Sequence, residues 1–275
     1  MNPQFFGPDN SKLFGTLQTA RGGGSLPARA VVICPPIGQE YIRSHWCLRL
    51  LAGQLARKGV HVLRFDYFGI GDSTGSSDDV ERLETWQSNI GSAIELMQNE
   101  FNVDSVTLFG LRAGATLAAN VALESDNVHS LVMWEPVWDG GESLNELRHM
   151  HSEMLDLWVC KMETENGSDA EEILGSRYCR SLLNEFEQLK VDWQAIEQPH
   201  LVFDVDEKRE LYDSLSDNRM RKVELIDEEN SWNDLKQLET AWLRPLTTRS
   251  IVTHAVDMFD RLERFEILGG LKVEV

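Results

Sequence analysis

The stretch that decides the fold is DSVTLFGLRAGATLAANVALE, residues 104–124. It begins with the apolar run 106–109, which is followed by the turn Gly110-Leu111-Arg112-Ala113-Gly114. Small and apolar residues at helical spacing come directly after the turn. Glycines allow a tight backbone bend and the close packing of a helix on a sheet. The pattern therefore predicts a strand, a sharp turn and a helix.

The turn resembles the nucleophile elbow of the α/β-hydrolases, G-x-S-x-G, in which the middle residue sits at the top of the central sheet. Here the middle residue is Arg112. A guanidinium stays protonated at physiological pH and cannot attack a carbonyl carbon. The resemblance therefore implies the frame for acyl chemistry without its usual nucleophile.

The length and net charge of the chain indicate how many domains it has and which partners it avoids. A chain of 275 residues with 42% hydrophobic residues is typical of one α/β domain that carries a modest insertion. The formal net charge of −19 predicts a surface that repels nucleic acid and anionic membranes. We therefore expect no nucleic-acid partner.

Targeting segments and cysteine spacing indicate where in the cell the chain is expected. The chain opens with no signal peptide, and no apolar run approaches about 18 residues, so no membrane span is expected. The four cysteines have no C-x-x-C spacing and are predicted to be reduced thiols. These features favour a cytoplasmic protein that needs no metal or other cofactor.

Strand and helix patterns alternate along most of the chain, after a predicted hairpin at 5–17. Such alternation predicts a mostly parallel sheet with right-handed crossovers, and ligands then bind beyond the carboxyl ends of the strands. The expected strands are 30–34, 60–65, 106–109, 129–134, 200–205 and 222–226, and the expected helices are 45–58, 83–100, 115–122, 206–217 and 248–265.

The β period is absent from 141–189, where acidic helical patterns predict a helical cap inserted over the site. The expected core is therefore 1–140 and 190–275. The tail 266–275 is predicted to add an edge strand.

Four stretches resemble one subgroup of hydrolases. CPPIGQEYIRSHW, VLRFDYFGIGDSTG, FGLRAGATLA and MWEPVWDG occur in this order, and together they are similar to the exosortase A system-associated hydrolases and to relatives found beside natural-product pathways. The resemblance covers 30–154. It implies an α/β-hydrolase fold, with a mostly parallel central sheet flanked by helices and a helical cap insertion. An arginine at the elbow belongs to the same pattern, and Ile37 and Gly38 take the place of the loop that supplies an oxyanion-hole amide.

The fold also implies an order for the catalytic triad: nucleophile, acid, histidine. The acid position would follow the strand 200–205, where Asp206 and Glu207 are available. The histidine position would follow the strand 222–226, and Asn230 is the residue expected there. An amide cannot act as a general base, so ordinary serine-hydrolase turnover is not expected.

Other residues are candidates to replace the missing nucleophile and base. Glu135, at the end of a predicted strand, is a candidate acid or base, or the salt partner of Arg112. His45 is a second candidate acid or base. Weaker alternatives are a nucleophilic Ser73 or Cys34, a Ser44/His45 dyad, and a metal site of His149, His151 and Glu153.

Two roles are open for Arg112. At the start of a helix, the guanidinium and backbone amides could bind an anion. The residues expected to line such a ligand site are Ile37, Gly38, Glu40, Arg112, Ala113 and Glu135. Alternatively, Arg112 could form a buried ion pair with Glu135, Asp204 or Asp206 that fills the site.

Two classes of function follow. The first is a non-hydrolytic pseudoenzyme that binds a small anionic or acyl-type ligand, or a partner protein, in a biosynthetic or envelope-polymer pathway. The second is an enzyme of altered mechanism (lyase, isomerase, acyltransferase or atypical hydrolase) that uses Arg112 with Glu135, His45 or a cap histidine. A homodimer is left open.

Overall fold

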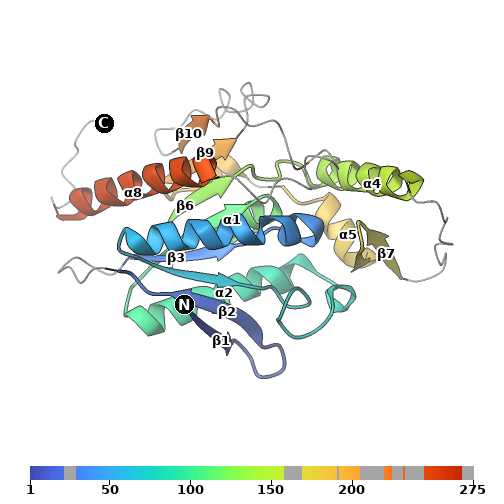
Figure 1. The fold of residues 1–275 in the computed structure, drawn as a ribbon, viewed down its shortest axis with the longest axis horizontal. Helices are drawn as coiled ribbons and strands as arrows, with labels where there is room; N and C mark the ends of the chain where they lie inside the picture. Colours follow the sequence, from blue (N-terminus) through green and yellow to red (C-terminus); the bar gives the residue numbers. More distant parts are fainter. Residues whose placement is uncertain are drawn as a thin grey trace.

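The computed structural model describes residues 1–21, 29–157, 169–190, 192–204, 220–224, 232 and 245–267. Within these residues the core is an eight-stranded sheet in the order β1-β2-β4-β3-β5-β6-β9-β10 (Figure 1). The pairs β1–β2 and β2–β4 are antiparallel, and the other neighbours are parallel. The strands are β1 Asn2–Phe6, β2 Leu13–Gln18, β3 Arg29–Cys34, β4 Val60–Phe65, β5 Val106–Leu111, β6 Val128–Trp134, β9 His200–Asp204 and β10 Met220–Glu224.

Helices cover both faces of this sheet. Successive side chains of a strand point to opposite faces, so Val32 and Cys34 pack in the core with α2 and α3, whereas Val31 and Ile33 pack in the core with α1 and α8. The described helices are α1 Gly38–Arg57, η1 Ser77–Asp79, α2 Leu83–Phe101, α3 Ala113–Glu124, α4 Gly140–Leu157, α5 Arg180–Glu187, η2 Trp193–Ala195 and α8 Pro245–Ile267.

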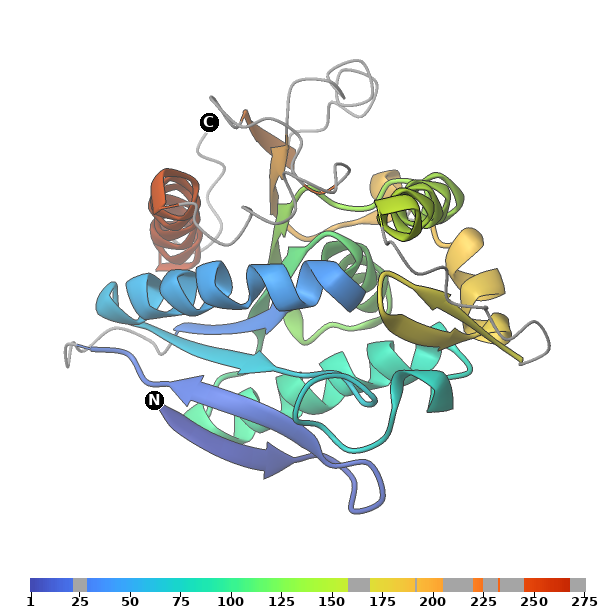
Figure 2. The ribbon, with the colours of Figure 1, turned by 45° about the vertical axis from the view of Figure 1, so that its right-hand side comes forward.

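A small group of elements lies beyond the carboxyl ends of the parallel strands. It contains α4, α5 and the antiparallel hairpin of β7 Ala170–Ile173 and β8 Ser176–Cys179. Figures 1 and 2 both show α4, α5 and β7 gathered at that end of the sheet. The two ends of this segment meet, because the backbone N of Gly140 donates to the O of Leu189 over 3.0 Å. The division into core and cap stays a prediction.

The structure confirms the N-terminal hairpin, the strands through β9 and the helix α2, and it corrects three expectations. Helix α1 begins at Gly38, seven residues before the predicted start. The helical pattern predicted through the second half of the cap was wrong for 170–179, which form the β7–β8 hairpin. The predicted edge strand at the tail was wrong at its start, since residues 266–267 end α8. The rest of that tail and the predicted helix 206–217 lie outside the described residues.

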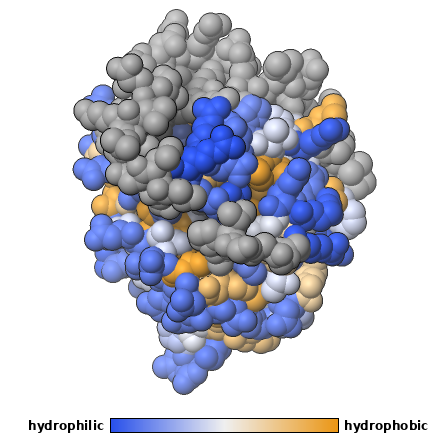
Figure 3. Space-filling model, turned by 90° about the vertical axis from the view of Figure 1, so that its left-hand side faces the viewer, coloured by the Kyte–Doolittle hydropathy of each residue, from blue (hydrophilic) through white to orange (hydrophobic). Residues whose placement is uncertain are grey.

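The surface is mostly polar on the face drawn in Figure 3, where apolar side chains of the described residues form only small groups. None of the helices in the described ranges combines the length and apolar character that a membrane span requires.

Candidate functional site

The elbow has the backbone shape that the sequence predicted. Arg112 lies between β5 and α3 with φ 52° and ψ −126°, a conformation that costs a non-glycine residue about 1–3 kcal/mol. A Cβ at Gly110 would overlap with the Cα of Ala115, and one at Gly114 would overlap with the carbonyl oxygens of residues 34 and 35. Both glycines are therefore needed for α3 to pack directly against the end of the sheet.

The side chain of Arg112 does not project into solvent. It is 5% exposed, and its Nε donates to Oε1 of Glu40 over 2.9 Å. Glu40, in the first turn of α1, is itself only 4% exposed. The Nη1 of Arg112 also donates to the backbone O of Glu135 over 3.5 Å. A buried ion pair thus occupies the place where an elbow nucleophile would stand.

The charges around Arg112 keep its guanidinium protonated. Burial favours the neutral form, but the carboxylates of Glu40 and Glu135, the hydrogen bond to Glu40 and the charge of Glu146 together raise the pKa of Arg112 above its ordinary value. The site therefore holds a permanent cation among several carboxylates, and it offers no proton that Arg112 could transfer.

Glu40, which the sequence predicts as a residue lining the site, forms an ion pair with Arg112. Asp206, one of the ion-pair partners predicted for Arg112, lies outside the described residues. The Glu135 carboxylate accepts a hydrogen bond from the indole of Trp134 over 3.1 Å, and the carboxylate of Asp204 accepts one from the indole of Trp138 over 3.1 Å. The early start of α1 explains the pairing with Glu40, since it carries this residue into the interior.

The loop before α1 is covered by the β7–β8 hairpin. Ile37 precedes the helix, and Gly38 has φ +57°. A Cβ at Gly38 would lie 2.5 Å from the hydroxyl oxygen of Tyr178, so the tyrosine rests directly on this glycine. Burial raises the pKa of Tyr178 to about 12. The backbone that would form an oxyanion hole is thereby closed by a neutral phenol.

An apolar pocket lies between this loop and the group formed by α4, α5 and the β7–β8 hairpin. Its free volume is about 20 Å³, enough for one ordered water but far below the roughly 300 Å³ of a typical ligand pocket. It is lined by Ile37, Gly38, Gln39, Trp86, Leu144, Leu147, Ile173, Leu174, Tyr178, Leu182, Leu183 and Phe186. A drug-sized ligand could enter only if α4, α5 or the β7–β8 hairpin moved.

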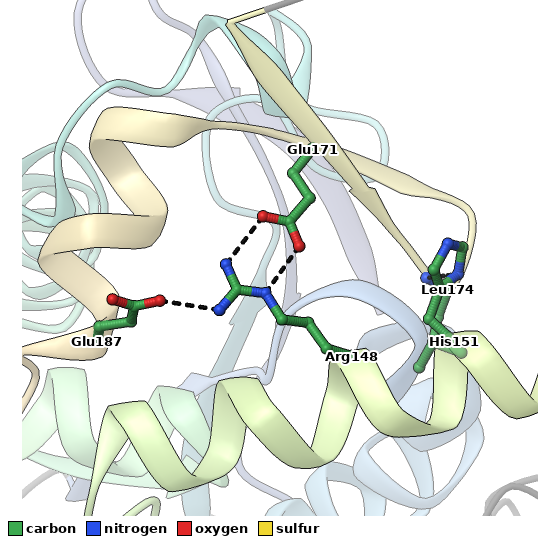
Figure 4. A network of polar contacts seen from close by, with 5 residues as sticks. All are labelled: Arg148, His151, Glu171, Leu174 and Glu187. Carbon is green, nitrogen blue, oxygen red and sulfur yellow. Dashed lines mark hydrogen bonds and ion pairs between the residues drawn. The ribbon is translucent and has the colours of Figure 1, made fainter. Parts of the chain in front are cut away.

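A polar network holds the hairpin against α4 (Figure 4). Arg148 donates twice to Glu171, over 2.7 and 2.8 Å, and once to Glu187 over 2.8 Å. One turn further along α4, Nδ1 of His151 accepts the backbone N–H of Leu174 over 3.1 Å. A single helix thus anchors β7, the hairpin turn and α5.

The candidate His45 lies elsewhere. It is exposed on α1, and its ring packs edge-on against Tyr41 at 6.4 Å between centroids. The hydroxyl of Tyr41 donates to Asp66 over 2.7 Å. Partial desolvation and the positive charge of Arg64 lower the pKa of His45. None of the contacts described for His45 reaches Arg112.

The weaker candidates have structural roles in the described residues. Ser73 bridges backbone groups, donating to the O of Asp66 and accepting from the N of Phe14. Cys34 is fully buried, and desolvation raises the pKa of its thiol far above the ordinary value. Ser44 donates to the backbone O of Tyr41 over 3.3 Å.

The metal hypothesis also has no support in the part of the chain that the structure describes. No group of three or more histidine, cysteine or acidic side chains there could hold a metal ion. Asp206, Glu207 and Asn230, the predicted triad positions, lie outside the described residues.

The strand order, the strained turn after β5 and the elements over the strand ends define an α/β-hydrolase fold. Residues 27–214 match the family described as serine aminopeptidase, S33, and the chain belongs to this family.

Solved structures of similar shape agree with this fold. Est1E from Butyrivibrio proteoclasticus with bound ferulic acid is 17% identical, with a TM-score of 0.66, over 94% of this chain and 99% of its own. XC6422 from Xanthomonas campestris, described as a serine hydrolase without lid, is 15% identical, with a TM-score of 0.57, over 94% of each chain. Mouse alpha/beta hydrolase domain-containing protein 10 is 13% identical, with a TM-score of 0.57, over 95% of this chain and all of its own. These identities establish the fold alone. No curated protein matches the chain.

Proposed function

We propose that this chain is a non-hydrolytic member of its family and works by binding rather than by turnover. One observation carries the proposal: the elbow position holds Arg112, which is buried and ion-paired with Glu40. Acyl transfer on this fold needs a nucleophile at the elbow and a base beside it. A guanidinium supplies neither, and the Ile37-Gly38 loop beside it lies under Tyr178.

The ligand class follows from the surroundings of the ion pair. The pocket above Gly38 is lined almost entirely by apolar side chains. The carboxylates of Glu40 and Glu135 already offset the positive charge of Arg112. An anionic head group would be repelled by these carboxylates. The arrangement therefore favours a neutral acyl-type ligand over an anionic one, and such a ligand would enter when the hairpin moves.

The alternative of an enzyme with altered mechanism gains less support. It needs an acid or base near Arg112, but His45 is exposed in the cluster with Tyr41 and Asp66. The Glu135 carboxylate is bound to the indole of Trp134. The subgroup resemblance to exosortase A system-associated hydrolases remains a prediction from the sequence.

The absence of hydrolysis is tested with a serine-directed fluorophosphonate and intact mass spectrometry. We expect no stoichiometric adduct on the wild type. Arg112→Ser restores only the hydroxyl, so it should show no more hydrolysis of p-nitrophenyl butyrate than the matched variant Arg112→Ala. A full adduct on the wild type, or saturable turnover by it, would overturn the proposal.

The ligand class is tested by calorimetric titration with decanamide, a neutral acyl compound, and with decanoate. Decanamide should bind more tightly. Leu147→Trp narrows the pocket and should weaken the binding of decanamide, whereas Leu123→Trp, on the partly exposed side of α3, should not. Tighter binding of decanoate, or equal binding by both variants, would contradict the neutral acyl-type assignment.

A further inference from the structure

A groove of about 310 Å³ runs along the outer side of α1, away from the Arg112 site. It is lined by residues of α1, β2 and the start of the chain. Helix α1 lies in front of the sheet in Figure 1 and contacts β2. Its lining consists of Met1, Gln18, Thr19, Arg21, Trp46, Arg49, Leu50, Gly53, Ala56 and Arg57. None of these residues belongs to the Arg112 site.

The charge of the groove is opposite to that of the chain. Its lining contains Arg21, Arg49 and Arg57 and no carboxylate, although the whole chain has 45 acidic against 26 basic residues. All three arginines are exposed, and within the described residues none of them forms an ion pair. The backbone N of Arg21 donates to the O of Ala56 over 2.8 Å, which fixes Arg21 beside the last turn of α1.

Apolar surface lies within the same strip of α1. Ile42, Trp46, Arg49, Gly53 and Arg57 are spaced by three or four residues, so they share one side of the helix. Ile42 is 59% exposed and Trp46 is 43% exposed. The guanidinium of Arg49 lies 5.4 Å from the centre of the Trp46 ring. A Cβ at Gly53 would lie 3.9 Å from Nη1 of Arg57 and from Oε1 of Gln18, so the helix surface between the arginines has no side chain of its own.

We propose that this groove is the docking surface for an acidic helical segment of another protein. Arg49 and Arg57 are eight residues apart, a rise of about 12 Å along α1. Carboxylates two turns apart on a partner helix match that separation, with an apolar side chain between them placed over Gly53. Exposed tryptophan and arginine are the residues that most often dominate the energy of protein interfaces.

The spacing argues against a single phosphate or diphosphate, which is too short to reach both Arg49 and Arg57. Physiological salt screens charges beyond about 8 Å, so the local arginines, rather than the chain's net charge of −19, decide which carboxylates bind here. A second copy of this chain is the other occupant, and the test below separates it from a partner's acidic helix. The inference goes beyond the proposed function and holds whether or not the chain hydrolyses esters.

The test begins with a phage-displayed library of helical peptides, selected on the wild-type chain and counter-selected on Arg49→Glu/Arg57→Glu. Enriched peptides should carry pairs of Asp or Glu seven or eight residues apart that flank an apolar residue. The best peptide is then measured by fluorescence polarisation. Arg49→Glu and Arg57→Glu should each weaken binding at least about tenfold, and Trp46→Ala should also weaken it.

Lys58→Glu is the matched control, since it makes the same charge change at the neighbouring position, outside the lining. It should change the affinity by less than about twofold. Equal loss in Arg57→Glu and Lys58→Glu, or no acidic bias in the enriched peptides, overturns the proposal. So does binding of sodium triphosphate as tightly as the peptide. Self-association of the wild type in sedimentation that Arg49→Glu abolishes would make a second copy the occupant and would also overturn it.

Discussion

Nε of Arg112 and Oε1 of Glu40 lie 2.9 Å apart, which ties the turn after β5 to the first turn of α1. These two residues are 72 positions apart in the sequence, and both are almost fully buried. The pair therefore acts as a structural link between two segments that, in a hydrolase of this fold, supply the nucleophile and an oxyanion-hole amide.

Removing one member of the pair should be costly. Arg112→Ala leaves the Glu40 carboxylate buried without its partner, so we expect a loss of about 3–5 kcal/mol in the free energy of unfolding, measured with urea. The double variant Glu40→Leu/Arg112→Met should recover most of that loss. Arg82→Ala, which breaks an exposed pair with Glu185, should cost less than about 1 kcal/mol. If Arg112→Ala lowers the free energy of unfolding no more than Arg82→Ala does, the ion pair does not stabilise the fold.

The elbow glycines should tolerate no side chain. In Gly114→Ala the new methyl group would overlap with the carbonyl oxygens of residues 34 and 35, so we expect at least about 3 kcal/mol of destabilisation. Gly91→Ala is the control, because nothing lies within 4 Å of a Cβ at that position in α2. It should stabilise the chain by about 0.5–1 kcal/mol. Similar melting temperatures for the two variants would contradict this reading of the close approach.

Closure of the site depends on the contact between Gly38 and Tyr178. Gly38→Ala places a methyl group 2.5 Å from the tyrosine hydroxyl and also strains a positive φ, which should destabilise the chain by about 1–3 kcal/mol. Adding Tyr178→Ala removes the overlap but not the strain, so the two changes should be non-additive. Hydrogen exchange at the amide of Leu174 should speed up in Gly38→Ala. Strict additivity would show that the hairpin does not rest on Gly38.

The contact between α4 and the β7–β8 hairpin should loosen in acid. The hydrogen bond from Arg148 holds the pKa of Glu171 below its usual value of 4.5. A carboxylate with a lowered folded-state pKa contributes stability above its unfolded pKa, and that contribution is lost as the pH falls through the folded value. Glu171→Gln should therefore cost about 1 kcal/mol at pH 7 and less at pH 3. Glu172→Gln, an exposed neighbour, should show no such pH dependence. Proteolysis of the 140–189 segment at the two pH values measures the effect.

Continuous apolar runs and glycine-bounded turns made the central strands and the elbow predictable. The hairpin at 170–179 was missed because its turn, Leu174-Gly175, has positive φ at both residues, and leucine is not the Asn or Asp that usually marks such a turn. The start of α1 was missed because Ile37 makes no side-chain cap, so the sequence carries no N-cap signal there. That second miss hid Glu40 as an ion-pair partner of Arg112.

The left-handed backbone at Arg112 also affects how such turns are interpreted elsewhere. Strain of this kind in enzymes is often attributed to the demands of chemistry. Here it persists around a side chain that is locked in an internal salt link, and it is enforced by the contacts of Gly110 and Gly114 with neighbouring backbone. The strained backbone conformation is therefore a property of the β5–α3 junction. By itself it does not indicate that a protein with this fold is an enzyme.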